Sequence, residues 1–141
     1  MISAILFVAQ MACGDAVMGF SHHNAKHTFR LFSDGGAIEI RGVDPKTVQA
    51  IRTHLVEISK SFAAGDFTKP KAIHDRLPDG AAEMKQLRDS IAYRYEEIES
   101  GGRVRIATSD PQALDAIHRF LRFQIAEHHT GDPTDVVTSP Q

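Results

Sequence analysis

The chain has 141 residues, of which 42% are hydrophobic and 24% are charged, as is typical of one globular domain. Acidic and basic residues are interspersed and give a formal net charge of −2. This balance excludes a surface that follows a phosphate backbone, so no nucleic acid is expected as a partner. The only cysteine is Cys13, which excludes an internal disulfide and a cluster of thiolate ligands.

An apolar run from Ile2 to Ala12 opens the chain. It is too short for a transmembrane segment, which needs about 20 apolar residues, and no Lys or Arg precedes it as in a signal peptide. Residues 1–17 are therefore interpreted as an N-terminal extension upstream of a start at Met18, as a weak signal-like segment, or as an ordered extension. The expected location is the cytoplasm, or outside it if the segment is a genuine export signal.

One pattern of about 40 residues occurs twice, as residues 27–67 and 93–133, without a gap. Ten of the 41 compared positions are identical in both copies: Gly35, Gly36, Ile40, Asp44, Pro45, Ala50, Ile51, Leu55, Gly65 and Asp66 recur 66 positions later. The sequence therefore predicts one duplicated domain over 18–133, with a linker over 68–92 and a flexible tail over 134–141.

Each repeat predicts a β-hairpin followed by a helix. The expected strands, rich in β-branched and aromatic residues, flank Gly-Gly turns and span 27–32, 37–41, 91–98 and 103–108. Asp44-Pro45 and Asp110-Pro111 then provide a capping carboxylate and a proline at the first helical position. Apolar residues follow at spacings of three and four, and Gly65 and Gly131 end the two helices.

Two strand-strand-helix units predict an α+β fold. We expect a four-stranded antiparallel sheet with both helices on one face and a pseudo-twofold axis. The linker contains Pro70 and Pro78, which predict no continuous helix before a short one over Ala81–Arg88.

Histidine is the residue type whose abundance suggests chemistry, with eight in the chain. Between the repeats, His27 corresponds to Tyr93, His54 to Phe120 and His128 to Phe62, so three histidines occupy positions that are aromatic in the other copy. Each histidine either satisfies a local hydrogen bond or belongs to a set that converges on a metal. The predicted metal ligands are His54, His74 and Met84, with His27 and His128 as further candidates. Imidazole and thioether ligands suit copper better than a structural zinc.

Several segments resemble a family of small uncharacterised bacterial proteins: His27–Leu31, Asp34–Ile38, Gly65–Phe67, Ile73–Asp75, Met84–Lys85 and Phe120–Ile125. The resemblance covers residues 18–133, and family members typically begin near the position of Met18. Some members carry the label aspartate carbamoyltransferase, and some are associated with copper handling.

The resemblance implies a copper site, although Glu57 or Ile58 and Lys71 stand where many members have His or Met. The carbamoyltransferase label is not supported, because the chain has no Ser-Thr-Arg-Thr phosphate loop and is too short for two α/β domains.

Three hypotheses for function remain open. The first is an accessory protein that binds copper in metal homeostasis. The second is a metal-free module that binds a protein partner, or a second copy as a homodimer, through the uncovered face of the sheet. The third is an enzyme whose site lies at the 68–92 linker, with His74 and Asp75 as an acid/base pair.

Overall fold

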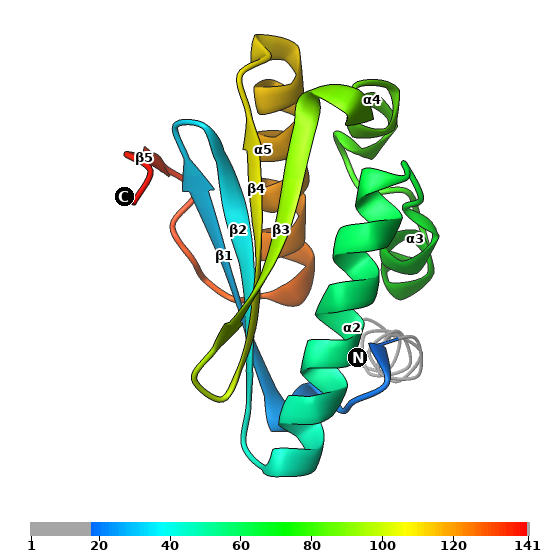
Figure 1. Cartoon of the computed structure of the whole chain (residues 1–141), viewed down its shortest axis with the longest axis vertical. Helices are drawn as coiled ribbons and strands as arrows, with labels where there is room; N and C mark the ends of the chain where they lie inside the picture. The colour runs from blue at the N-terminus through cyan, green and yellow to red at the C-terminus, as the bar shows by residue number, and fades with distance from the viewer. Residues whose placement is uncertain (1–17, 141) are drawn as a thin grey trace, which may run out of the picture.

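Two β-hairpins form the centre of the structure, a computed structural model that describes residues 18–140. β1 (Ala25–Phe32) pairs with β2 (Gly35–Gly42), and β3 (Ile91–Ile98) pairs with β4 (Gly101–Thr108), both antiparallel (Figure 1). Both predicted hairpins are present, and each returning strand begins at the Gly-Gly pair rather than after it. The segment 1–17, and with it the interpretation of that segment, lies outside the described residues.

The sheet has five strands in the order β3-β4-β2-β1-β5. β2 and β4 pair antiparallel at its centre, and the short β5 (Val136–Val137) pairs parallel with Leu31 and Phe32 of β1. The sheet is therefore mixed and not the four-stranded antiparallel sheet that was expected. Two residues are too few to show an alternating pattern, so β5 carries no sequence signal within the expected tail.

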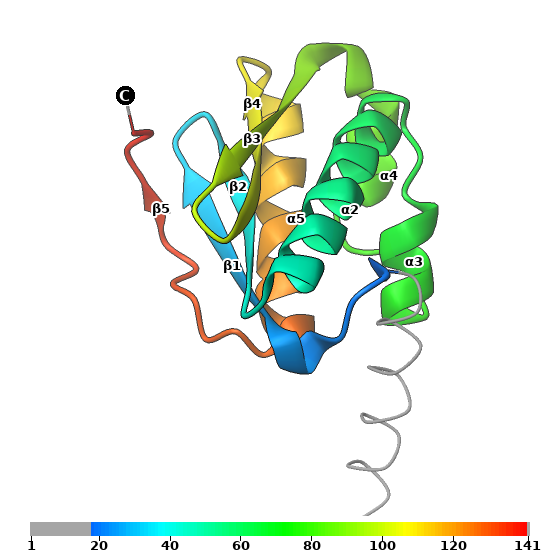
Figure 2. The ribbon, with the colours of Figure 1, turned by 60° about the horizontal axis from the view of Figure 1, so that its bottom comes forward.

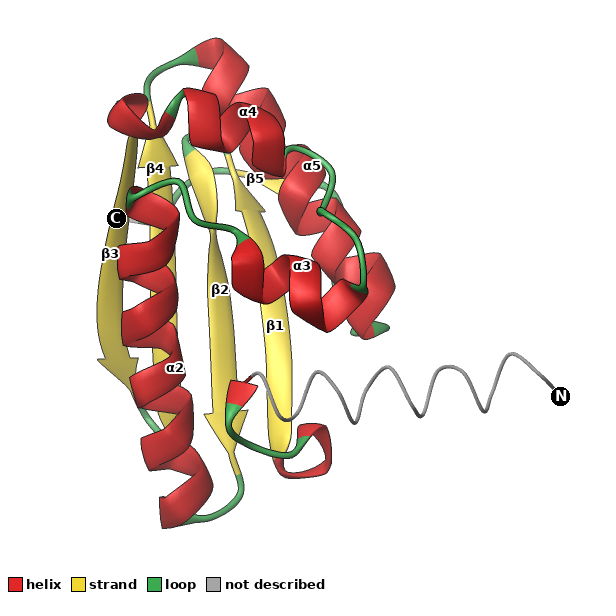
Figure 3. Cartoon of the chain, turned by 90° about the vertical axis from the view of Figure 1, so that its right-hand side faces the viewer, coloured by secondary structure: helices red, strands yellow, loops and turns green. Residues whose placement is uncertain are grey.

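Two long helices cover one face of the sheet, α2 (Pro45–Ala63) and α5 (Pro111–His128) (Figures 2 and 3). Both begin at the predicted Asp-Pro pairs. An oxygen of Asp44 accepts a hydrogen bond from the backbone N of Thr47 at 2.8 Å, and Asp110 accepts from the backbone N of Gln112 at 2.8 Å. Each carboxylate thus satisfies an amide that has no partner within its helix.

The linker contains two short α-helices, α3 (Thr68–His74) and α4 (Ala81–Gln86). The second matches the expected short helix, although it ends earlier. The first differs from the prediction, in which Pro70 excludes a helix in this segment. Pro70 lies in the first turn of α3, where a missing backbone donor breaks no helical hydrogen bond. Two short 3-10 helices, His22–Asn24 and Arg88–Ser90, precede β1 and β3.

The hydrophobic core lies between the sheet and α2 and α5. Its largest fully buried side chains come from both halves of the chain and include Phe62, Phe120, Leu31, Ile40, Ile51 and Ile106. No helix within residues 18–140 is both long and apolar enough to cross a membrane.

Candidate functional site

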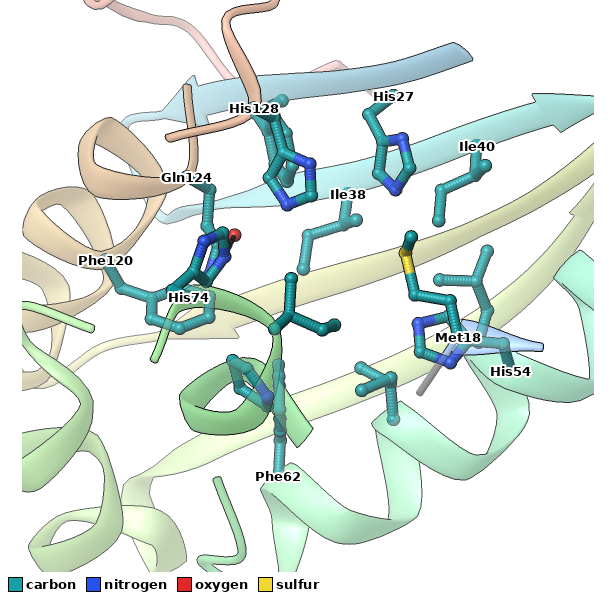
Figure 4. A pocket seen from close by; sticks show the side chains of 15 residues that line it. Met18, His27, Ile38, Ile40, His54, Phe62, His74, Phe120, Gln124 and His128 are labelled. Atoms are coloured by element: carbon teal, nitrogen blue, oxygen red, sulfur yellow. Dashed lines mark hydrogen bonds between the residues drawn. The ribbon is translucent and has the colours of Figure 1, made fainter. Parts of the chain in front are cut away.

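A small cavity lies between the sheet and the helices. Its volume is about 40 Å³, enough for a few water-sized groups and far below the 300–1,000 Å³ typical of small-molecule sites. Most of its lining is apolar and comes from β1, β2, α2, α3 and α5 (Figure 4). Its polar lining consists of four histidines and one glutamine: His27, His54, His74, His128 and Gln124.

Four of the five predicted metal ligands therefore line the same cavity. His27 comes from β1, His54 from α2, His74 from α3 and His128 from α5, so four separate elements bring them together. Met84, the fifth, is fully buried on α4 and does not line the cavity. The methionine at the cavity is Met18, which is 5% exposed. Its side chain lies by His27 and His54 (Figure 4). Met18 was not among the predicted ligands.

His54 has a buried ring nitrogen without a hydrogen-bond partner. Its residue is 6% exposed, and its Nδ1 is buried with no hydrogen-bond partner. Phe20 packs edge-on against the ring, with the ring centroids 5.6 Å apart. Burial, helped by the nearby charges of Lys69 and His27, lowers the pKa of His54 to about 4. The imidazole is therefore neutral near pH 7 and has a lone pair available for a ligand.

The other three histidines of the lining contact one another through their rings. The rings of His27 and His128 are nearly parallel, with 21° between their planes and 4.6 Å between their centroids. His74 meets the ring of His128 edge-on at 4.9 Å. Burial, together with the neighbouring histidines, lowers the pKa of His128 to about 2. His128 therefore stays neutral near pH 7.

His74 has polar groups beside both of its ring nitrogens. Nε2 lies 2.8 Å from Oε1 of Gln124, and Nδ1 lies 4.0 Å from Oε2 of Glu127. Burial lowers the pKa of His74, and it outweighs the opposing effects of Gln124 and Glu127. Asp75, the partner of His74 in the acid/base hypothesis, is exposed in a left-handed conformation at the end of α3. The structure therefore does not assemble that pair.

The remaining histidines lie apart from the cavity lining. His118 is buried, and its Nε2 lies 2.8 Å from the backbone oxygen of Phe32 and 3.1 Å from that of Gly35, so it ties α5 to the turn of the first hairpin. The rings of His22 and His23 lie 3.9 Å apart and are tilted by 39° in the 3-10 helix before β1. His129 ends α5 in a left-handed conformation.

A metal site built from histidine and carboxylate alone does not exist in the described part of the chain. No three His, Cys, Asp or Glu side chains among residues 18–140 are placed to hold an ion together. The cavity does combine the unpartnered Nδ1 of His54 with the thioether of Met18 and a further imidazole. Such neutral nitrogen and sulfur donors fit a soft ion of low coordination number.

Comparisons of the chain with models of protein families, with curated proteins and with solved structures gave no match.

Proposed function

We propose that this protein is a small accessory protein that binds copper, as the cuprous ion, in the histidine-lined cavity and serves in metal homeostasis. The observation that carries the proposal is the Nδ1 atom of His54, buried at the cavity without a hydrogen-bond partner. A buried polar atom in a native protein normally has a partner, so an exception calls for an explanation such as a bound ion.

The chemistry of the cavity supports a monovalent soft ion. The lining contains no carboxylate, and the lowered pKa values keep His54 and His128 neutral. A divalent ion would bring two uncompensated charges into this apolar space, which is costly. Thioether ligands favour copper(I), and imidazole accepts it as well.

His54 and Met18 are the proposed ligands, with His27 or His128 completing the set. The rings of His27 and His128 are stacked. Because the lone pair of an imidazole lies in the plane of its ring, two stacked rings do not point at the same ion. We therefore assign only one of the two as a ligand. We assign His74 a positioning role, because its edge packs on His128 while its nitrogens face Gln124 and Glu127. In this proposal the protein binds copper(I) and transfers it to another protein. A cavity of about 40 Å³ leaves no space for an organic substrate.

The internal repeat supports a specialised role for these histidines. We infer that the two halves derive from one duplicated unit. At the centre of the sheet, Ile38 pairs with Val104, its own counterpart 66 positions later. Under that inference, Phe62 is the counterpart of His128, and Phe120 is the counterpart of His54. Both phenylalanines line the same cavity as the two histidines. Each pair of equivalent positions thus contributes one aromatic ring and one imidazole to the cavity.

Copper(I) binding can be measured by competition with a chromogenic chelator under anaerobic, reducing conditions, using the full chain without a histidine tag. We expect one equivalent of copper(I) per chain. His54→Phe should weaken binding at least tenfold, and Met18→Leu, which keeps the side-chain volume, should weaken it severalfold. A variant with both His22→Ala and His23→Ala is the matched control for surface histidines and should bind within twofold of the wild type.

Two results would contradict this function. One is the absence of copper(I) binding by a folded wild-type chain. The other is equal affinity in the wild type and a folded His54→Phe variant, with circular dichroism verifying the fold.

A further inference from the structure

The face of the sheet opposite α2 and α5 is rich in arginine. Side chains alternate between the two faces of a strand, and Phe29, Ile38 and Ile40 line the cavity under the helices. Their strand neighbours therefore point to the other side. We call this side the arginine face. It carries six cationic residues and two glutamates from β1 to β4: Lys26, Arg30, Arg41, Arg94, Arg103 and Arg105, with Glu39 and Glu96.

Both glutamates form ion pairs with arginines of this face. Glu39 is 5% exposed and accepts hydrogen bonds from Nε of Arg103 at 2.9 Å and from Nη1 of Arg41 at 3.0 Å. Glu96 accepts from Nη1 of Arg103 at 3.1 Å and from Nε of Arg94 at 2.8 Å. Two carboxylates thus hold three guanidinium groups in position. The side chains of Arg41 and Arg94 remain 46% and 73% exposed.

One row across the sheet contains arginine without any acidic residue. Cross-strand pairing aligns Arg30 of β1 with Ala37 of β2, Ala37 with Arg105 of β4, and Arg105 with Arg94 of β3. Like charges directly opposite each other in a sheet are destabilising. The small Ala37 side chain also leaves space between Arg30 and Arg105.

The arginines in this row differ in how firmly they are held. Arg105 is 12% exposed, donates to an oxygen of Asp34 at 2.6 Å and lies over the ring of Phe32 at 4.7 Å. Arg30 is exposed, and within residues 18–140 it forms no ion pair with a carboxylate. The row therefore combines a fixed central cation with outer cations that can contact a partner.

We propose that the arginine face is a docking surface for an acidic segment of a partner protein. Guanidinium groups held in fixed positions bind carboxylates in a bidentate manner and lose little freedom on binding. Counting Asp34 at its edge, the face has three cations in excess of its carboxylates, although the chain as a whole has a net charge of −2. A negatively charged partner would therefore be guided to this face.

Other occupants fit less well. In a twofold homodimer through this surface, each copy would present the same excess of cations to the other. Single-stranded nucleic acid binds to grooves with exposed aromatic platforms, whereas the ring of Phe32 is 6% exposed and lies under Arg105. The docking surface is on the opposite side of the sheet from the histidine-lined cavity, so this inference does not depend on copper binding.

The test is fluorescence anisotropy with a fluorescein-labelled peptide of ten glutamates, titrated with the full chain at 50 and 300 mM salt. Two labelled ligands serve as comparators: a Gly/Ser peptide of equal length and a ten-nucleotide oligothymidine. The acidic peptide should bind more tightly than both comparators, and less tightly at the higher salt concentration.

Two matched double variants then locate the binding surface. Arg30→Gln with Arg94→Gln removes two charges from the row and should weaken peptide binding at least fivefold. Lys46→Gln with Lys60→Gln removes two charges from the exposed side of α2 and should leave it within twofold. Equal weakening by both variants would overturn the proposal, as would tighter binding of the oligonucleotide. A homodimer in sedimentation analysis that Arg30→Gln with Arg94→Gln dissociates would replace the acidic partner by a second copy.

Discussion

The buried ring of His74 is hydrogen-bonded to Gln124, with 2.8 Å between Nε2 and Oε1. Gln124 is itself 5% exposed, so each side chain satisfies a polar group of the other inside the core. This pair connects α3 of the linker to α5 and fixes the edge of the cavity at which His128 lies.

Replacing His74 should affect stability more than metal binding. His74→Phe leaves the amide of Gln124 buried without its partner, which costs about 1–3 kcal/mol in the free energy of unfolding. Urea denaturation measures this loss. His74→Phe combined with Gln124→Leu should recover part of it, because both polar partners are then removed. Under the proposed function, His74→Phe keeps copper(I) affinity within threefold, and a tenfold loss of affinity would instead make His74 a ligand.

The ion pairs of Glu39 predict a pH dependence of stability. Burial raises the pKa of Glu39, but hydrogen bonds and charges from Arg103 and Arg41 outweigh burial, so that the pKa lies below its ordinary value. A lowered pKa in the folded state stabilises the fold above the unfolded pKa of about 4.3. This stabilisation is lost as the pH falls through the folded pKa.

Glu39→Gln should therefore be less stable than the wild type at pH 7, by about 1.5–3 kcal/mol, the range for hydrogen bonds to charged groups. The difference should shrink below pH 4, and urea denaturation between pH 3 and pH 7 measures it. Glu99→Gln, at an exposed residue of the second hairpin turn, is the control and should change stability by less than about 0.5 kcal/mol. A constant deficit of Glu39→Gln over the whole pH range would contradict the assignment.

Removing the hydroxyl of Tyr93 should stabilise the protein. This hydroxyl is buried without a hydrogen-bond partner, and burial raises the pKa of Tyr93. Its ring packs edge-on against Phe62 with the centroids 6.0 Å apart, and Tyr93→Phe retains that contact. We expect a gain of about 1 kcal/mol, the lower end of the cost of a buried unpartnered polar group. A lower melting temperature for Tyr93→Phe would show that the hydroxyl has a favourable role.

Gly101 should not tolerate a side chain. A Cβ atom at this position would lie 1.8 Å from the backbone oxygen of Ile40 on the neighbouring strand. Gly101→Ala must therefore separate β2 from β4 and should cost about 3 kcal/mol. Gly131→Ala is the control, because nothing lies within 4 Å of its Cβ position and only its φ of +71° is unfavourable, at a cost of about 1 kcal/mol. Equal thermal stability of the two variants would contradict this account.

The sequence predicted the elements whose determinants are local. The Asp-Pro pairs and the apolar spacing of three and four are encoded within a few residues, and α2 and α5 begin where these signals predict. The first linker helix was not predictable from Pro70 alone, because a proline breaks a helix in its interior but is tolerated in its first turn. β5 is held by backbone hydrogen bonds to β1, which have no preferred residue type.

The candidate site was predictable only in part. Comparing the repeats singled out His27, His54 and His128 because each replaces an aromatic residue of the other copy. Met18 and Gln124 gave no comparable signal: one lies outside the repeats, and the other corresponds to Ile58. Met84 was predicted as a ligand because it lies in the linker. Its side chain instead packs in the core, where it is fully buried.

The position of β5 limits how copies of this chain can aggregate. Together with the hydrogen bonds from the backbone of Phe29 to Asp132 and of Ser33 to Val137, it covers the C-terminal part of the outer edge of β1. In the described part of the chain, β3 is then the long strand whose outer edge has no strand partner along its whole length. Growth of a fibril through continuous sheets needs two free edges in each molecule. Association along β3 therefore leaves a partly covered edge at β1, which disfavours further growth, and shortening the chain before Val136 would remove this cover.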